Sequence, residues 1–365
     1  MHDLTQRKDG SYEMAYVGKP GWHGLGNQLP AGASKEEWRK AAGYDWEILS
    51  SPVEFAVGDM KVYPGDFAPY PGQKVNYRSD NQFPLSITSD SWQPMQPGQI
   101  LDYMDEVVHK FGFVLNTAGT LDGGRKFWML ADIGCEDAVK DPRDRIKGRL
   151  LASTSVDRTL PTSFRFVAER VVCQNTLSMA LGEQGGTHHI FKHRRVFSAQ
   201  EANEALGLQA RGAFDQAILA YRLLADCEMP EEVVVDATMR LFDLNLDQRS
   251  TDEIQKLAKT KPVRSIIELT QNPSALIGSE MAGLQETAWG WVNAVTQFVD
   301  HERGARTSDS RMMRAQFGDG YRAKNRAFHM ALSYAQTGIA ALDPNKDLRD
   351  LLALGDDLQN FDTEE

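Results

Sequence analysis

Short runs of apolar, β-branched and aromatic residues, separated by polar or glycine-containing turns, fill the first half of the chain. Such runs are typical of β-strands. They predict strands at residues 46–57, 60–63, 73–79, 84–89, 111–117, 126–133, 150–155 and 187–192. The turns at 80–82 and 118–124 each separate two of these strands, which indicates hairpins and therefore an antiparallel sheet.

Helical patterns, with apolar residues three or four positions apart, lie between these strands and predominate after residue 197. Ser34 and Glu37 have the spacing of a capping box, which predicts the start of a helix. In the first half, helices are also predicted at 100–110 and at about 164–181. The second half predicts helices at 198–227, 231–242, 251–259, 263–271, 286–303, 311–316 and 321–337.

Together these elements predict an α+β protein, with an N-terminal antiparallel sheet and packed helices followed by a mainly helical C-terminal half. We expect an α+β domain over residues 1–196 and a helical domain over residues 197–354. The last segment, residues 355–365, carries five acidic residues and no basic one. It is expected to be a flexible acidic tail.

The composition is that of an ordinary globular protein: of the 365 residues, 41% are hydrophobic and 25% are charged. This composition excludes collagen-like, low-complexity and disordered proteins. Three cysteines are too few and too scattered for a disulfide framework or a cysteine-based zinc site. No run approaches the roughly 20 apolar residues of a membrane helix, so we expect a cytoplasmic protein with no membrane partner.

The charge is distributed unevenly along the chain, whose formal net charge is -11. Residues 140–195 hold eleven Lys and Arg against five acidic residues, a net charge of +6. Residues 303–326 hold seven basic residues against two acidic ones, a net charge of +5. Such asymmetry favours a polyanion-binding surface on an acidic protein. The alternative is two basic faces that neighbouring acidic residues neutralise in the folded state.

Aromatic residues accompany several of these bases, a mixture that suits phosphate contacts combined with the stacking of single-stranded bases. Tyr77 and Trp128, for example, stand next to basic residues at the two predicted hairpins. The candidate nucleic-acid-binding residues are Arg78, Arg125, Lys126, Arg158, Arg165, Arg170, Lys192, His193, Arg194, Arg195, Arg314, Arg322 and Lys324.

Enzyme signatures are not evident: the sequence contains no P-loop, nucleophile elbow or HExxH motif. The histidines 188, 189 and 193 have no carboxylate at ligand spacing, and the consecutive residues 300–302 point to different faces of a helix. Cys173 lies among apolar residues and is expected to be a small buried side chain. We therefore predict no catalytic residue, no metal site and no cofactor.

Several segments together resemble one family. They are Trp22-His23-Gly24-Leu25-Gly26, Tyr77-Arg78-Ser79-Asp80-Asn81, Thr117-Ala118-Gly119-Thr120-Leu121, Arg170-Val171-Val172-Cys173-Gln174-Asn175-Thr176-Leu177 and the tryptophan-rich stretch from Trp289 to His301. This is the phage/plasmid-like protein family that contains domain of unknown function 932, and the resemblance spans about residues 15–335. Gln297 and Phe298 depart from the Glu-Tyr that the family often has.

The resemblance implies a phage or plasmid origin and a bacterial host cell. The family's order of elements, a helix, several antiparallel strands and a long helix, is similar to that of phage single-strand annealing proteins of the Erf and RecT type. That likeness implies single-stranded DNA binding and strand annealing, in recombination or replication, by a homo-oligomer. Replication or recombination proteins are possible partners through the acidic tail.

Two other classes of function remain open from the sequence. One is an acidic interaction or counter-defence protein that mimics DNA, which the net charge of -22 outside the two basic segments favours. The other is a metal-dependent nucleic-acid enzyme that uses His301 or the histidines near residue 190. Metal dependence of activity would distinguish this enzyme from a DNA-binding protein.

Overall fold

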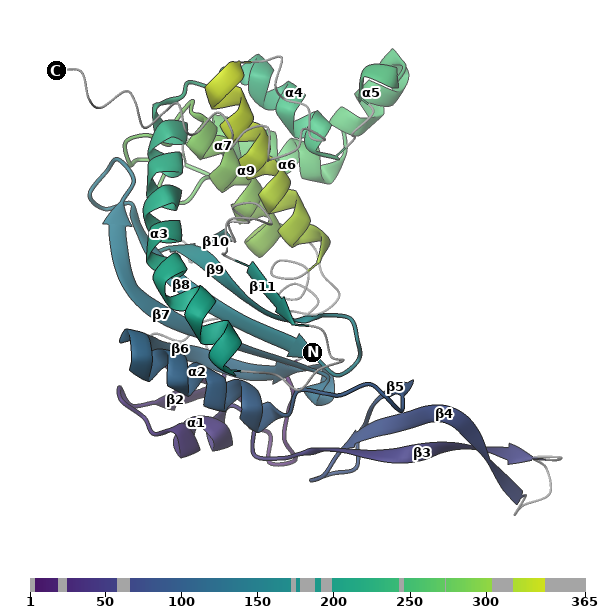
Figure 1. Ribbon diagram of the computed structural model, residues 1–365. Coiled ribbons are helices and arrows are strands. Elements are labelled where there is room, and N and C mark those ends of the chain that lie inside the picture. The colour runs from purple at the N-terminus through teal and green to yellow at the C-terminus, as the bar shows by residue number, and fades with distance from the viewer. Residues whose placement is uncertain are drawn as a thin grey trace.

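The fold is organised around one large twisted sheet (Figure 1). The computed structural model describes residues 4–18, 25–57, 66–171, 175–177, 188–191, 199–242, 246–272, 274–303 and 318–338. The strands of the large sheet are β1 (Met14–Val17), β2 (Asn27–Leu29), β6 (Val114–Leu121), β7 (Lys126–Ala138), β8 (Arg145–Ser155), β9 (Thr162–Arg170), β10 (Asn175–Leu177) and β11 (His188–Phe191).

An antiparallel meander of β6, β7, β8 and β9 forms the centre of this sheet. On one side β1 pairs antiparallel with β6 and parallel with β2. On the other side β10 and β11 both pair antiparallel with β9, at its C-terminal and N-terminal halves respectively. Of the two hairpins predicted from the sequence, the one around residues 118–124 connects β6 and β7 in this meander.

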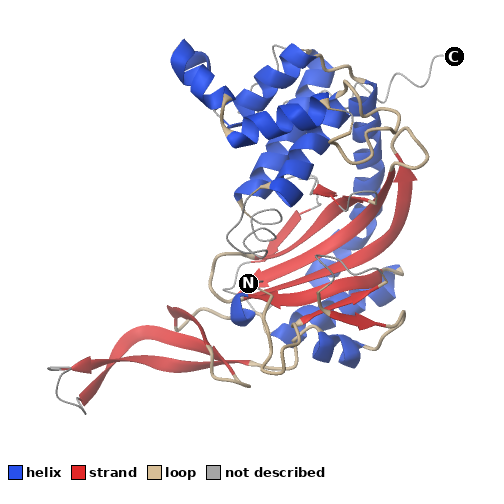
Figure 2. Ribbon diagram, turned by 180° about the vertical axis from the view of Figure 1, so that it is seen from behind, coloured by secondary structure: helices blue, strands red, loops and turns tan. Residues whose placement is uncertain are grey.

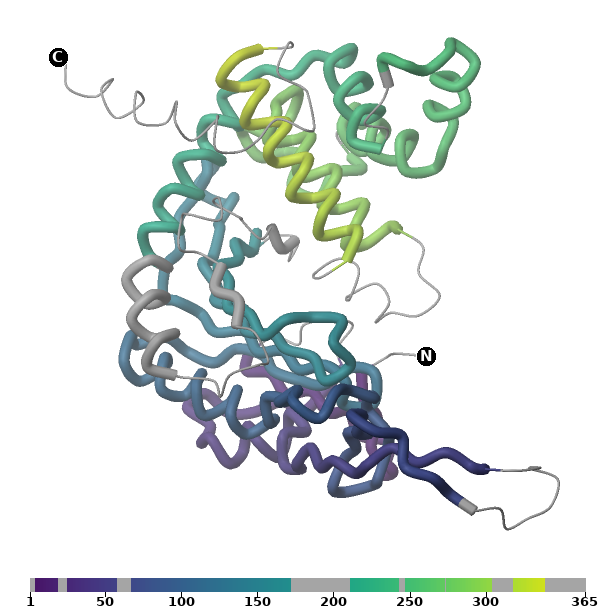
Figure 3. Tube along the Cα trace, turned by 45° about the vertical axis from the view of Figure 1, so that its right-hand side comes forward, coloured from purple at the N-terminus to yellow at the C-terminus, as the bar shows by residue number. Residues whose placement is uncertain are grey.

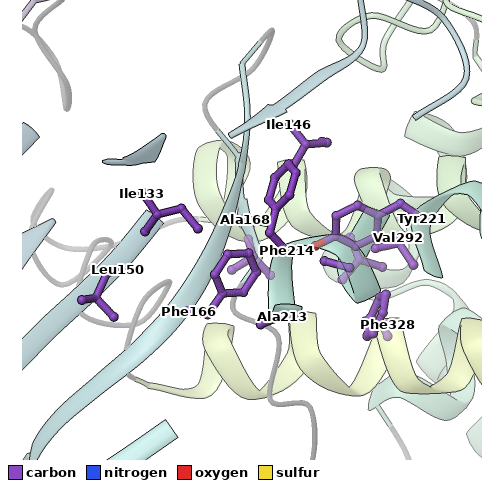
Figure 4. Packing of buried hydrophobic residues seen from close by; sticks show 14 of the residues in the cluster. Ile133, Ile146, Leu150, Phe166, Ala168, Ala213, Phe214, Tyr221, Val292 and Phe328 are labelled. Atoms are coloured by element: carbon purple, nitrogen blue, oxygen red, sulfur yellow. The ribbon is translucent and has the colours of Figure 1, made fainter. Parts of the chain in front are cut away.

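Alternate residues of the central strands lie in two different cores, as the two-residue period of a strand requires. Leu150 and Phe166 belong to the large core on one face of the sheet, under α2 (Pro97–Phe111) and α3 (Ala199–Asp226). Leu151 and Val167 belong to a smaller cluster on the opposite face. Figure 4 shows Phe166 close to Phe214 of α3, whose rings meet edge to face with centroids 6.4 Å apart.

The C-terminal half is helical above one end of the sheet (Figure 2). Its described elements are α4 (Glu231–Phe242), η3 (Leu246–Gln248), α5 (Thr251–Ala258), α6 (Lys261–Gln271), α7 (Ala288–Gln297), a π-helical turn at Phe298–Glu302 and α9 (Asp319–Thr337). Tyr221 of α3 stacks on Trp289 of α7 with ring centroids 4.5 Å apart. The large core is therefore continuous from the sheet into the helices.

A second sheet of three strands extends from the body as an arm (Figures 1 and 3). It consists of β3 (Ile48–Val57), β4 (Asp66–Arg78) and β5 (Pro84–Ser89), in that order. α1 (Lys35–Ala41) precedes the arm and begins at the predicted capping box, in which Ser34 and Glu37 bond each other's backbone amides.

The structure confirms the α+β class and the division into a sheet-containing first half and a helical second half. The predicted helix at about 164–181 is wrong, because residues 162–170 form strand β9 and residues 175–177 form strand β10. The reason is tertiary, because Phe164, Phe166 and Ala168 face the large core while Arg165 and Val167 face the other way. The predicted boundary at residue 196 and the acidic tail lie outside the described residues.

None of the helices in the described part of the chain has the length and apolar character that a membrane-spanning helix requires.

Candidate nucleic-acid interface

Two turns of the large sheet lie side by side at the end where the arm is attached. The β6–β7 turn contains η2 (Asp122–Gly124), and the β8–β9 turn spans residues 156–161. Lys126 is paired with Ser155, and the Val156 amide donates to the Arg125 carbonyl oxygen at 2.7 Å. Three candidate residues, Arg125, Lys126 and Arg158, are therefore gathered at this hairpin end.

Arg125 connects the hairpin end to the base of the arm. Its guanidinium lies over the ring of Phe83, 4.9 Å from the centroid. Its Nε donates to the Leu85 carbonyl oxygen at 2.9 Å, and its Nη1 donates to Asp122 at 3.0 Å. Because Phe83 is 38% exposed, the pair presents both a positive charge and an aromatic ring near the surface.

Lys126 and Arg158 differ in what surrounds them. The Lys126 ammonium lies 2.6 Å from Asp157 and 3.5 Å from Asp122. Burial opposes ionisation of Asp157, but Lys126 and Thr159 outweigh it and lower the pKa of this carboxyl. Arg158 is exposed at the tip of the turn, with a φ of 65°. No ion pair of Arg158 occurs within the described part of the chain, so its charge faces solvent.

A second group of candidates meets where β9 approaches the start of α9. The Arg165 guanidinium lies over the ring of Tyr321, 4.4 Å from the centroid, although the two residues are far apart in sequence. Lys324 is 1% exposed and donates to Asp300 at 2.7 Å. Burial lowers the pKa of Lys324, and Asp300 opposes that effect. Arg322 is exposed, and among the described residues it forms no ion pair.

Five of the candidates that were predicted to contact phosphate are buried in the described structure, including Lys126 and Arg165, which are 9% and 6% exposed. Arg78, Arg170 and Lys324 are 1%, 3% and 1% exposed, so their charges are directed at internal carboxylates. The Arg78 guanidinium contacts Glu13 at 2.7 Å and Asp80 at 2.8 Å. Burial disfavours its charged form, but these carboxylates outweigh burial and raise the pKa of Arg78.

Arg170 belongs to a buried polar cluster that sequence reasoning missed. Its Nε donates to Asp144 at 2.5 Å, and its Nη1 donates to the Ile277 carbonyl oxygen at 2.9 Å. The Trp289 indole also donates to Asp144, at 3.2 Å. The cluster connects the sheet to α7, whose Trp289 is more than a hundred residues away in the sequence. No local sequence pattern therefore predicts that these side chains meet.

Five candidates, Lys192, His193, Arg194, Arg195 and Arg314, lie outside the described residues, as does Cys173. His188 and His189 are on β11. Within the described part of the chain no group of three or more His, Cys, Asp or Glu side chains is placed to hold a metal ion.

His329 of α9 gives the fold a predictable pH dependence. Burial lowers the pKa of His329 to about 4, and its Nδ1 has no hydrogen-bond partner in the described structure. An unfolded histidine titrates near 6.5, so between about pH 6.5 and 4 the unfolded chain binds more protons. Stability is therefore lost as the pH falls through this window, by about 2 kcal/mol at pH 5.

Urea unfolding at several pH values measures this loss. The His329→Gln variant should lose less stability between about pH 7 and pH 5 than the unsubstituted chain, because the titrating group is absent. The matched control is His109→Gln, at a side chain that is 78% exposed. A pH dependence of the His329 variant equal to that of the control contradicts the assignment.

Comparison with known families identifies the chain. The family model described as domain of unknown function DUF932 matches residues 84–317. The chain belongs to the DUF932 family. The match begins at the first residue of β5, so it includes the meander, α3 and the helices through α7. Strands β3 and β4 of the arm precede the DUF932 match, and α9 follows it. No curated protein and no solved structure matches the chain.

Proposed function

We propose that the protein binds single-stranded DNA along a basic strip formed by Arg125, Arg158 and Arg322, with the aromatic rings of Phe83 and Tyr321 beside it. The observation that carries the proposal is that Arg158 and Arg322, from the two basic segments of an acidic chain, are both exposed without an ion pair among the described residues. Exposed, uncompensated arginines are available to phosphates.

The contact between β9 and α9 brings the two basic segments together. Arg165 lies three residues after Thr162, the first residue of β9. At a rise of roughly 3.3 Å per residue, it is therefore about 10 Å along the strand from the β8–β9 turn. Its guanidinium covers Tyr321, the residue next to Arg322. A DNA backbone that contacts Arg158 at the hairpin end can therefore continue toward Arg322. The rings of Phe83 and Tyr321, which lie beside the basic strip, can stack on the DNA bases.

The arrangement of the core elements favours annealing as the purpose of this binding. A helix (α2), a four-strand antiparallel meander (β6 to β9), the short strands β10 and β11, and a 28-residue helix (α3) follow one another in the chain. This order is similar to that of the Erf- and RecT-type annealing proteins, which hold one strand in a basic groove while its complement pairs. The similarity is one of element order and supports the proposal by analogy.

The double variant Arg158→Ala/Arg322→Ala tests the proposal. Each lost phosphate contact should reduce the magnitude of the salt slope by about 0.7 for a single strand. Binding to a fluorescent oligothymidine should therefore weaken about tenfold or more at low salt, and the slope should fall by about 1.4. Fluorescence anisotropy at several salt concentrations measures both quantities.

The matched control is Lys256→Ala/Lys259→Ala, which removes the same charge from exposed positions at the end of α5. Figure 1 shows α5 at the opposite end of the molecule from the arm. If the two double variants have equal affinities and equal salt slopes, the net charge of the chain governs binding and the basic strip does not. Failure of the unsubstituted chain to bind the oligonucleotide would refute the proposal directly.

A further inference from the structure

The arm carries most of the large hydrophobic side chains that the described structure leaves exposed. Phe55 is 50% exposed and Phe67 is 58% exposed, and both lie in its distal part. The remaining exposed apolar residues of β3, β4 and β5 are Leu49 (39%), Val57 (48%), Tyr70 (54%) and Ile87 (58%). Apolar patches of a few hundred Å² that stay exposed mark interaction sites.

Both faces of the distal arm are apolar. Phe55 is paired with Ala68, and Ala56 is paired with Phe67. Residues that are directly opposite share a face, and consecutive residues alternate between faces. Phe55 and Phe67 therefore lie on opposite faces. Strand β5 pairs only with Gln73–Tyr77 of β4, so this distal part is a ribbon of two strands. A two-stranded ribbon is marginally stable alone in water, and a partner that covers its faces would stabilise it.

The edges of the ribbon are unsuited to adding another strand. Pro52 lies within β3, which is an edge strand of the arm sheet. Pro69 and Pro71 lie in β4 before the segment that β5 covers. Proline lacks the amide hydrogen that a strand ladder needs and blocks pairing at an edge. The arm is therefore built to contact a partner through its side chains and not through its backbone.

Charge decides which partner fits. The two long strands of the arm contain two acidic residues, Glu54 and Asp66, and two basic ones, Lys74 and Arg78. Arg78 is buried against Glu13 and Asp80 at the base of the arm. In the described strands of the arm, Lys74 is then the one base that is not buried, and Glu54 and Asp66 outnumber it, so these strands offer no net positive charge to a nucleic acid or an anionic membrane. The whole chain, in contrast, has a net charge of -11, so two copies repel each other through their bodies.

We infer that the arm is a self-association surface, through which the arms of two or more copies of this chain pack face to face. β3 is about 30 Å long at roughly 3.3 Å per residue, whereas charges are screened beyond about 8 Å at physiological ionic strength. Contact through the neutral arms therefore brings copies together while their acidic bodies stay apart. This role is independent of the basic strip.

The exposed area is sufficient for such an interface. A half-exposed aromatic side chain contributes about 100 Å² of apolar surface, since a fully buried one covers roughly 150–250 Å². The three aromatic and three aliphatic side chains together offer about 500 Å² on one arm. These side chains lie on both faces, so an arm that other copies cover on both faces buries about 500 Å² of its own surface and about 500 Å² of theirs, in total about 1,000 Å², the lower limit of a specific interface.

The test is the mass of the full-length protein in solution, measured by light scattering after size exclusion at about 100 µM. The unsubstituted chain should have at least twice the 40.8 kDa mass of one copy. The Phe55→Ser/Phe67→Ser variant should fall to the mass of one copy. Both side chains are exposed, so its circular dichroism spectrum should remain that of the unsubstituted chain.

The matched control is Leu219→Ser on α3, at a side chain that is 65% exposed and lies outside the arm. It should keep the mass of the unsubstituted chain. A single-copy mass for the unsubstituted chain would overturn the inference, and so would an arm variant of unchanged mass. If the arm variant keeps its mass but loses affinity for oligothymidine, the arm stacks on bases and the inference is also wrong.

Discussion

Replacing Asp144 with alanine is expected to lower the free energy of unfolding by about 3–5 kcal/mol, because it removes one partner of a buried ion pair. Asp144 is fully buried, and the guanidinium of Arg170 beside it is 3% exposed. Asp144 also accepts a hydrogen bond from the Trp289 indole. The substitution therefore leaves two buried donors without this carboxylate, in the contact between the sheet and α7.

Urea unfolding followed by tryptophan fluorescence measures this effect. The control is Asp226→Ala, which removes a carboxylate that is 65% exposed from its ion pair with Lys140. That exposed pair is expected to contribute at most about 1 kcal/mol. If both variants lose the same small amount of stability, the Asp144 cluster does not hold the two halves of the molecule together.

Replacing Gly290 with alanine is expected to destabilise the protein by about 3 kcal/mol or more, since overpacking of a rigid core is costly. A Cβ atom at this position would overlap the carbonyl oxygen of Leu284 and approach its carbonyl carbon to 2.9 Å. These are backbone atoms, which cannot rotate away. All ten residues of α7 are buried, so the helix has little room to shift.

The control for this variant is Gly212→Ala in α3, where a Cβ atom would meet nothing within 4 Å. Alanine in an exposed helix interior is more favourable than glycine by roughly 0.5–1 kcal/mol. The two Gly→Ala substitutions should therefore have opposite signs in thermal or urea unfolding. A neutral Gly290 variant would show that the loop before α7 moves freely.

Part of the candidate interface could be predicted from the sequence, and part could not. Charge counting found the two basic segments, and the structure leaves Arg158 and Arg322 exposed, one in each segment. The same counting also selected Arg170, and the pairing of bases with aromatic residues selected Arg78; both are internal. Their carboxylate partners Glu13 and Asp144 lie 65 and 26 residues away in the chain, so no local pattern distinguishes them from surface arginines.

The exposed arm illustrates a similar limit. Apolar residues correctly predicted a strand at 46–57, where β3 lies, and at 73–79, the second half of β4, whereas residues 66–72 of β4 were not predicted to be a strand. A strand pattern, moreover, does not say whether another element covers it. Phe55 and Phe67 look like core residues in the sequence, and only the distance of the arm from the body leaves them exposed (Figure 3).

By itself the sequence determined the elements whose signals are local. The capping box at Ser34, helix α4 between Pro230 and Phe242, and the hairpin around residues 80–82 need only neighbouring residues to form. Tertiary structure alone decided that residues 162–170 are a strand, because β8 on one side and β10 and β11 on the other supply their hydrogen bonds. It also decided which charges are buried, since burial depends on what packs against a side chain and not on its neighbours in the chain.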